Sequence, residues 1–411
     1  MGQPSLGEAR SARAWANCVA LSLALAALIG CAGPLPNTPE TPPASGSDLE
    51  YRTELIARAT KMRLWERHYW HVLLHYGEDL FTGYTSEADG PGFFLAPAGR
   101  TDPRAELKAT IAGFFSEAII EPGKQTAQCT LIARYHWLDG QLGFDRARMP
   151  EHPCERYWAW RGALDPGSVT LIYASYYFNN PSSMFGHTLL RIDKRGRAEE
   201  QRLLDYTVTY GAVVPEDEGG LLWALNGLVG GYNGYFAVLP YYIKVKEYSD
   251  FESRDLWEYR LDFNDAELDR LMRHLWEMGS TYFNYYFFKE NCSYHLLSLL
   301  EVARPELDLR SRFLAWTLPT ATVDQVLRVP GLVESVTYRP SRGSVIRWRL
   351  DELTPDRREL VFALAADTGE QEGEPFQALP VAGQAAVLDT AIDLHQFELA
   401  GQKEPPPEQK A

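Results

Sequence analysis

The pattern of apolar and polar positions predicts a helical first part of the chain. Leu49 to Tyr84 carries apolar residues at helical spacing, and Asp102-Pro103-Arg104 opens another predicted helix that runs through Phe115. Between them, Phe93 to Leu95 is predicted to be a short strand. We therefore expect a helical, partly mixed N-terminal region over residues 49–160.

The period changes farther along the chain, where branched and aromatic residues gather in short runs. Five runs are predicted to be strands, namely 130–135, 169–177, 187–192, 202–210 and 256–261. Lys194 to Arg197 is the predicted turn of a hairpin between the third and fourth runs. Asn264-Asp265 caps one predicted helix, and Asn291-Cys292 opens the next. This order predicts an α+β fold whose antiparallel sheet packs on the helix that begins at Cys292.

Cys292 and His187 are the candidate catalytic pair. Asn291 is a preferred N-cap, so Cys292 falls at the first position of its helix, where free N–H groups lower the pKa of a thiol. His187 lies on a predicted strand, and an imidazole beside the thiol would accept its proton and later return it to a leaving group. The alternative is a small buried cysteine without chemistry, which is the commoner role at a helix start.

A catalytic imidazole also needs a partner that fixes its tautomer. A hairpin centred near Gly196 would place Asp205 opposite His187, with Thr209 behind it, so Asp205 is the predicted third catalytic residue. The alternative is that Asp205 is a solvated charge at a strand end. His295, one turn beyond Cys292 on the same helix face, is a rival base for which packing is the favoured role.

The start of the chain resembles a bacterial lipoprotein signal. Residues 1–31 have a short basic start and an apolar run that is too short to cross a bilayer. Leu28-Ile29-Gly30-Cys31 resembles a lipobox, which predicts that Cys31 carries a diacylglyceryl group. Ala32 follows it, which resembles lipoproteins sorted to the outer membrane. We expect a lipid-anchored protein on the periplasmic face of that membrane; the alternative is an ordinary signal cleaved nearby.

Four further segments complete the predicted organisation. Residues 32–48 are rich in Pro, Ser and Thr and are expected to form an extended tether. A thiol-enzyme core is predicted over residues 161–345 and a C-terminal region over residues 346–402. The tail 403–411 is expected to be disordered.

Cysteine usage agrees with an exported protein. Cys18 lies in the predicted signal and Cys31 is the predicted lipid site, which leaves three cysteines. In an oxidising compartment the natural disulfide joins Cys129 and Cys154, although the sequence leaves other pairings open. Cys292 is then an odd thiol, which is a reason to consider it reactive.

No cofactor and no nucleic-acid partner are expected. His68, His71 and His75 lie near one helical face among Trp, Tyr and Leu residues, so packing is favoured over metal binding. The formal charge of -15 argues against nucleic acid and against a polybasic contact with anionic lipid.

The stretch from Gly219 through Ile243 contains no charged residue and is rich in apolar residues and glycine. Its glycines, two asparagines and Pro240 disfavour a membrane-spanning helix, and no Lys-Ser/Thr follows the glycines as a phosphate loop requires. Two interpretations remain open. The stretch forms buried strands with a core loop, or it forms an acyl-binding groove or a lip that contacts the membrane.

Four separated segments resemble the Lnb N-terminal periplasmic domain family in the order in which they occur. They are Asn180 to His187, Glu252 to Tyr259, Phe287 to Ser293 and Tyr338 to Ser341. The resemblance covers roughly Leu55 to Ser341 and implies an essential His and Cys, which fall on His187 and Cys292. His before Cys, with Asn-Cys opening a helix, also resembles circularly permuted NlpC-type papain-like proteins, including the lecithin retinol acyltransferase group.

These resemblances imply a thiol acyltransferase or hydrolase with a permuted papain-like core. Its expected partner is a phospholipid or a lipoprotein acyl group, which would form a thioester on Cys292. The sequence shows no C-terminal spanning segments like those of the family's namesake, so the predicted anchor is its own lipid at Cys31. Two alternatives stay open: an NlpC-like amidase or endopeptidase that cuts cell-wall peptide, and a non-catalytic envelope module.

Overall fold

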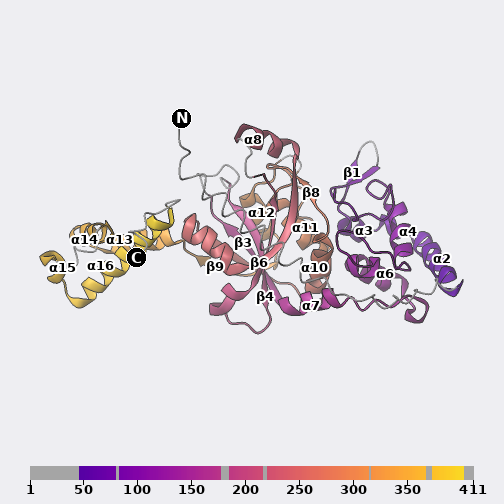
Figure 1. The fold of residues 1–411 in the computed structure, drawn as a ribbon, viewed down its shortest axis with the longest axis horizontal. Helices are drawn as coiled ribbons and strands as arrows, with labels where there is room; N and C mark the ends of the chain where they lie inside the picture. Colours follow the sequence, from indigo (N-terminus) through magenta and orange to yellow (C-terminus); the bar gives the residue numbers. More distant parts are fainter. Residues whose placement is uncertain are drawn as a thin grey trace, which may run out of the picture. The chain divides into compact units, whose positions relative to one another are not determined.

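The computed structural model describes residues 46–79, 83–176, 185–215, 220–313, 316–366 and 373–401 (Figure 1). Residues 47–411 cluster as one compact unit, separate from the first 46 residues. The predicted signal, Cys31, nearly all of the tether and the tail 403–411 lie outside the described residues. The fold is mixed α+β with an antiparallel sheet, as predicted.

The N-terminal region is largely helical and carries one small hairpin. Its elements are α2 (Gly46–Lys61), η2 (Leu64–Glu66), α3 (His68–Leu73), β1 (Tyr76–Asp79), β2 (Gly83–Ser86), α4 (Pro103–Gly113), α5 (Ala127–Thr130), α6 (Ile132–Leu142), η3 (Arg146–Arg148) and α7 (Glu155–Leu164). Asp102 caps α4 as predicted, because its carboxylate accepts from two N–H groups of the first turn. The predicted strand at Phe93 to Leu95 is wrong, since this segment forms turns.

The predicted strand at 130–135 is also wrong, because these residues belong to α5 and α6. Glu277 accepts hydrogen bonds from the N–H groups of Ala133 and Arg134 at the start of α6. The Arg134 side chain is fully buried and pairs with Glu106 and Glu277. These distant carboxylates stabilise the helix start and override the strand preference of the branched residues.

The sheet contains seven antiparallel strands in the order β8-β6-β5-β4-β3-β7-β9. Their bounds are β3 (Pro166–Ala174), β4 (His187–Lys194), β5 (Tyr206–Ala212), β6 (Tyr232–Pro240), β7 (Leu256–Leu261), β8 (Phe283–Tyr285) and β9 (Val333–Arg339). Four predicted strands are confirmed as β3, β4, β5 and β7, with differences at the ends. Of the other three, β6 lies in the charge-free stretch 219–243, where buried strands were one of the two open interpretations, and β8 and β9 were not predicted.

Each face of the sheet packs on a different set of helices. On one face, α10 (Asp265–Met278) and α11 (Cys292–Ala303) cover the main core, which includes Leu171, Leu190 and Val208. On the other face, α9 (Tyr241–Val245) and the π-helical turn η6 (Lys246–Phe251) cover a smaller cluster with Ile172 and Leu189. The helix that begins at Cys292 therefore packs on the antiparallel sheet, as predicted.

The remaining helices are α8 (Gly220–Val229), η5 (Glu199–Leu204), α12 (Pro319–Leu327), α13 (Arg342–Glu352), α14 (Pro355–Ala366), α15 (Glu374–Gln377) and α16 (Val381–Gly401). Of these, α12 adds to the main core and η5 packs against the smaller cluster. The last four build their own small core around Ile346, Val361 and Val387. Within the described ranges, no helix has both the length and the apolar character needed to cross a membrane.

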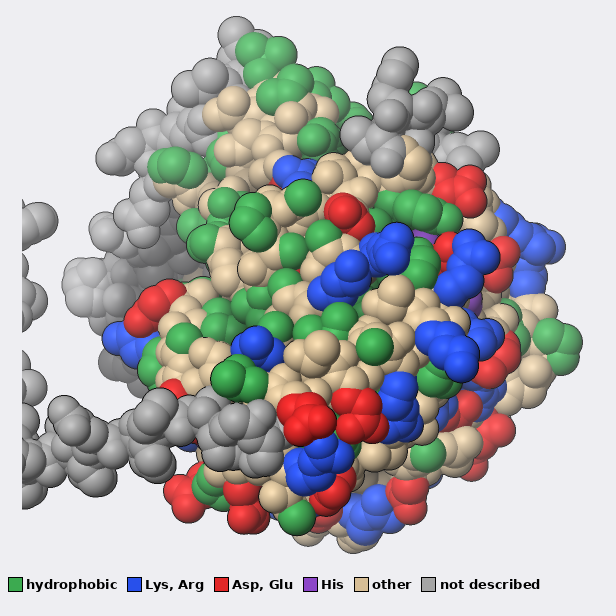
Figure 2. All heavy atoms as spheres, turned by 90° about the vertical axis from the view of Figure 1, so that its right-hand side faces the viewer, with side chains coloured by type: hydrophobic (Ala, Val, Ile, Leu, Met, Phe, Trp, Pro, Cys, Tyr) green, Lys and Arg blue, Asp and Glu red, His purple; other side chains and the backbone are tan. Residues whose placement is uncertain are grey.

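The face shown in Figure 2 carries a mixed charge distribution. Lysine and arginine side chains alternate there with aspartate and glutamate, whereas hydrophobic side chains gather along the upper edge. Such interspersed charges cancel over short distances in physiological salt. This face therefore offers no broad basic surface to a nucleic acid.

Candidate active site

Cys292 occupies the first position of α11, as predicted. The Asn291 side chain accepts hydrogen bonds from the N–H groups of Ser293 and Tyr294. Its amide group donates to the carbonyls of Phe287 and Thr317, at 3.0 and 2.6 Å, which fixes the orientation of the cap. Cys292 is buried, and it is the one free cysteine in the part of the chain that the structure describes.

His187 begins β4 and faces the thiol of Cys292, with 3.0 Å between Nδ1 and Sγ. Gly186, directly before it, has a φ of 91°, and its Cα lies against the ring of Tyr173, so a larger residue would be strained there. Directly after it, the Thr188 hydroxyl donates to Ser293 Oγ at 3.0 Å and ties the strand to the helix. Residues far apart in sequence thus form the predicted thiol–imidazole pair.

Burial sets the protonation state of this pair. It raises the pKa of the Cys292 thiol, although hydrogen bonds from Thr188 and Ser293 and the charge of Arg254 act in the opposite direction. It also lowers the pKa of His187 to about 3, with smaller contributions from Arg254 and Lys244. The Ser293 N–H at the helix start lowers the thiol pKa, as expected, but desolvation outweighs it and the net shift is upward. The resting pair is a neutral thiol beside a neutral imidazole.

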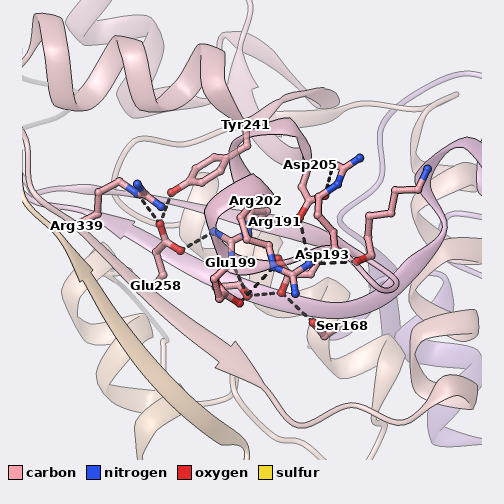
Figure 3. Close-up of polar contacts among 12 residues, drawn as sticks. Ser168, Arg191, Asp193, Glu199, Arg202, Asp205, Tyr241, Glu258 and Arg339 are labelled. Carbon is pink, nitrogen blue, oxygen red and sulfur yellow. Dashed lines mark hydrogen bonds and ion pairs between the residues drawn. The ribbon is translucent and has the colours of Figure 1, made fainter.

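The predicted partnership of Asp205 with His187 is wrong. Ile192 pairs with Tyr206, so Asp205 lies level with Asp193 near the far end of β4, about 20 Å along the strand from His187. There the Asp205 carboxylate binds the guanidinium groups of Arg197 and Arg202 (Figure 3). The reason is η5, which occupies the connection and shifts the register away from a hairpin centred on Gly196.

Thr209 and His295 have different positions relative to the pair. Thr209 lines the same cavity as His187. His295 is fully buried, and its ring packs against those of Tyr210 and Phe283 with centroids 4.3 and 4.5 Å apart. Burial lowers the pKa of His295 well below its usual value. Packing is therefore the role of His295, and His187 is the imidazole that faces the thiol.

A cavity of about 320 Å³ adjoins His187. Its walls come from β5, from α9 with η6, and from the segment before Cys292; besides His187 they include Thr209, Tyr210, Lys244, Glu247, Tyr248, Glu252, Arg254, Tyr285 and Phe287. The charged side chains form ion pairs with one another, Lys244 with Glu247 at 2.7 Å and Arg254 with Glu252 at 2.9 Å. The cavity is thus polar but locally neutral.

Tyr285 is a site residue that the sequence did not single out. Tyr285 lies near Cys292: burial raises the pKa of Tyr285 well above its usual value, the Cys292 thiol adds to this rise, and the Cys292 backbone N–H opposes it. It lines the cavity, and its ring stacks on Tyr210 with centroids 5.7 Å apart. The aromatic run directly before Cys292 was a signal, but only the fold shows which of its rings meets the sulfur.

The segments that carry the family resemblance meet in the structure. Trp257 pairs with Tyr338 across β7 and β9, and Arg339 binds Glu258 at 2.9 Å. Ser341 donates its N–H to the Asp255 carboxylate at 2.8 Å. These motif residues are therefore structural partners that close the edge of the sheet. Asn180 to Met184, from the first motif, lie outside the described residues.

Glu258 belongs to a buried ionic network on the α9 side of the sheet (Figure 3). It accepts hydrogen bonds from Arg191, Arg339 and Tyr241, the last of which belongs to α9. Arg191 also binds Asp193 at 2.6 Å. The network thereby connects the strand that begins with His187 to the helix that carries Lys244 of the cavity wall.

A disulfide joins Cys129 and Cys154, with sulfur atoms 1.96 Å apart. It lies in the N-terminal region, linking α5 to the start of α7. In the ranges that the structure describes, no group of His, Cys, Asp and Glu has the arrangement of a metal site. The His71 Nε2–H donates to the Trp65 carbonyl at 2.7 Å, and the ring packs edge-on against Tyr84.

Comparison with protein families matches three consecutive parts of the chain. Residues 62–141 match a domain of unknown function (DUF7843), and residues 336–411 match another (DUF7842). Residues 156–329 match the Lnb N-terminal periplasmic domain. No curated protein and no solved structure matches the chain.

The match to the Lnb domain spans β3 to α12 and includes both members of the thiol–imidazole pair. A periplasmic domain family places this part of the chain in the periplasm, so the protein belongs to the cell envelope. The part of the chain that holds His187 and Cys292 is a member of the Lnb N-terminal periplasmic domain family.

Proposed function

We propose that this protein is a cysteine-nucleophile acyltransferase or hydrolase that acts on the acyl groups of lipids or lipoproteins in the cell envelope. The observation that carries the proposal is the 3.0 Å contact between Cys292 Sγ and His187 Nδ1 beside a cavity. The imidazole on a strand precedes the thiol at a helix start, which supports a circularly permuted papain-like core.

The reaction begins with proton transfer, because both groups are neutral at rest. His187 Nδ1 accepts the thiol proton while the sulfur attacks the carbonyl carbon of an acyl ester. The oxyanion that forms is held by the backbone N–H of Cys292 and the hydroxyl of Tyr285. His187 then returns the proton to the leaving oxygen, the C–O bond breaks and a thioester remains on Cys292.

Resolution of the thioester uses the same groups. An amine or a water molecule attacks the thioester carbon, and His187 accepts the proton of the attacking group. The C–S bond then breaks and the thiol recovers its proton from His187. Attack by an amine makes the protein an N-acyltransferase, and attack by water makes it a hydrolase.

The test is mass analysis of the full chain after incubation with phospholipid vesicles. We expect an acyl mass on the peptide that contains Cys292, released by hydroxylamine because a thioester is cleaved by it. Cys292→Ser is expected to abolish the adduct, and His187→Ala to slow its formation by about 100-fold or more, the usual effect of a positioned base.

His68→Ala is the matched control. This histidine is exposed, and its side chain hydrogen-bonds to the Pro305 carbonyl within the described part of the chain. The variant is expected to react at the rate of the unchanged protein. An adduct that persists in Cys292→Ser would contradict the proposed nucleophile.

A second candidate function is supported by the charged side chains of the cavity. Lys244, Glu247, Glu252 and Arg254 provide both signs of charge, as a site for a peptide's amine and carboxylate would. Cleavage of a cell-wall peptide that depends on Cys292, without an adduct from phospholipid, would favour an NlpC-like amidase. The ion pairs within the cavity already satisfy these charges, so the acyl substrate is preferred.

A further inference from the structure

The exposed side of α8 is apolar. Leu225 and Leu228 are each 50% exposed and Val229 is 69% exposed, and their spacing places them on one side of the helix. α8 belongs to the stretch from Gly219 to Ile243 that contains no charged residue. Three large aliphatic side chains that face water together, with no charged residue between 219 and 243, are typical of a surface that another apolar phase covers.

The opposite side of α8 is held against the segment that leads to Cys292. The Phe287 N–H donates to the Gly227 carbonyl at 2.9 Å. A side chain at Gly227 would overlap the Phe287 ring, and one at Gly230 would overlap the Tyr286 ring. The two glycines thus permit close packing on this side of α8. Because this side is the packed one, Leu225 and Leu228 on the other side face water.

An aromatic cluster follows directly in sequence on the segment that contacts α8. Phe288 packs edge-on against Phe185 and Trp316, with ring centroids 6.4 and 5.6 Å apart. Trp316 is itself 66% exposed. Phe287, which contacts α8, also lines the cavity beside His187. We call this surface the apolar rim; it consists of Phe185, Leu225, Leu228, Val229, Phe288 and Trp316.

We propose that the apolar rim inserts into the hydrocarbon edge of a phospholipid bilayer and holds the cavity beside His187 against the membrane. Insertion into the membrane does not depend on the proposed function; only the identity of the substrate that insertion brings to Cys292 rests on it. In Figure 1, α8 lies at the upper end of the sheet. An acyl ester in the outer part of the bilayer is then next to the thiol without leaving the membrane.

Two properties favour a bilayer as the partner of this surface: the net charge of the chain and the length of the tether before the domain. The formal charge of -15 repels anionic headgroups, so contact must come from the uncharged rim. The predicted lipid on Cys31 and the tether 32–48 allow the domain to reach at most about 60 Å from its anchor. That distance keeps the rim near a membrane surface, where partial insertion of a short apolar helix is favourable.

The test places an environment-sensitive fluorophore at the rim of the full chain. Leu228→Cys is labelled in a Cys292→Ser background, which cannot form the proposed thioester, so the result does not depend on catalysis. On vesicles of zwitterionic phospholipid we expect a blue shift and strong quenching by lipids that carry nitroxide on their acyl chains. Val381→Cys, on an 82% exposed position of α16, is the control that should stay unquenched.

Two conditions separate the membrane from other partners. The signal at Leu228→Cys should persist in about 1 M salt, where the Debye length is about 3 Å, because the contact is apolar. Loss of the signal in salt, or a label as water-exposed as that at Val381→Cys, would overturn the proposal. A blue shift without vesicles that grows with protein concentration would assign the rim to a second copy instead. Val229→Cys repeats the measurement if Leu228→Cys does not fold.

Discussion

At the scale of single residues, burial and hydrogen bonding act against each other at the thiol. Burial raises the pKa of Cys292, while N–H donors around the sulfur lower it in part. A neutral resting thiol resists oxidation better than a thiolate, since the thiolate is the reactive form. The pair is therefore suited to an oxidising compartment, and in the proposed reaction the thiol becomes nucleophilic only as His187 accepts its proton.

Tyr285→Phe tests the oxyanion donor. The substitution keeps the ring that stacks on Tyr210 but removes the hydroxyl beside the Cys292 N–H. We expect the rate of adduct formation to fall by about 100-fold or more, the usual loss for one oxyanion donor, without a change in the melting temperature. Tyr282→Phe, in the same aromatic run, is the control; an equal loss in both variants would contradict a role for the Tyr285 hydroxyl.

The lowered pKa of His187 predicts how the reaction depends on pH. The base must be neutral, and its pKa of about 3 lies far below the ordinary histidine value of 6.5. We expect adduct formation to show no loss as pH falls through about 6.5, and to decline only as pH approaches about 3. A pH–rate profile with a midpoint near 6.5 would show that His187 is solvated in the working protein.

The same shift predicts acid sensitivity of folding. Between about pH 6.5 and 3 the unfolded chain binds a proton at His187 that the folded chain does not, so stability falls as pH falls through this window. His274, with a pKa lowered to about 3, and His75 act in the same direction. The free energy of unfolding, measured with urea, should therefore depend more steeply on pH in the unchanged protein than in His187→Gln. The difference in slope corresponds to at most one bound proton.

At the scale of elements, the ionic network couples β4, β7 and β9 to α9. Glu258 is the shared acceptor, and Arg191 beside it is 2% exposed. Burial alone would raise the pKa of Glu258, but Arg191, Arg339 and the Tyr241 hydroxyl together outweigh burial and hold the pKa below its usual value. The carboxylate is thus charged at neutral pH and neutralises two arginines.

Glu258→Gln is expected to lower the free energy of unfolding by about 3 kcal/mol, because it leaves Arg191 buried beside a single carboxylate. Urea unfolding measures the loss. Glu334→Gln is the matched control, since it breaks the exposed pair with Arg260 across the same two strands and should cost about 1 kcal/mol or less. Equal effects in the two variants would show that burial of the network contributes little.

At the scale of the whole molecule, three family matches follow one another along a chain whose described parts build distinct cores. The main core joins the N-terminal helices to one face of the sheet, and α13 to α16 hold a separate cluster. The disulfide joins two elements within the N-terminal region. The thiol–imidazole pair lies between the sheet and α11, away from this cross-link in sequence.

Removal of the disulfide should destabilise the fold without changing the chemistry. Cys129→Ala with Cys154→Ala opens a loop with a sequence separation of 25, which corresponds to about 3 kcal/mol of unfolding free energy. Urea unfolding and the rate of the Cys292 adduct, measured on the same sample, check both parts. A large fall in rate while the protein stays folded would show that the N-terminal region contributes to the site.

Local signals in the sequence determined the start of the Cys292 helix, the strand of His187 and the segments of β3 and β7. A cap such as Asn291 and a run of branched residues act within a few positions, so sequence alone is enough. The sequence also showed the charge-free stretch but not how it folds. The close contact of Gly227 with Phe287 decided which side of α8 faces water.

Tertiary structure decided the features that depend on distant groups. Glu277 made a helix of the predicted strand at 130–135, and η5 moved Asp205 away from His187 by shifting a strand register. Tyr285 lies near Cys292 because of the path that the chain takes directly before α11. Register and burial arise from contacts between segments far apart in sequence, and desolvation of the thiol reversed the effect expected from its helix position.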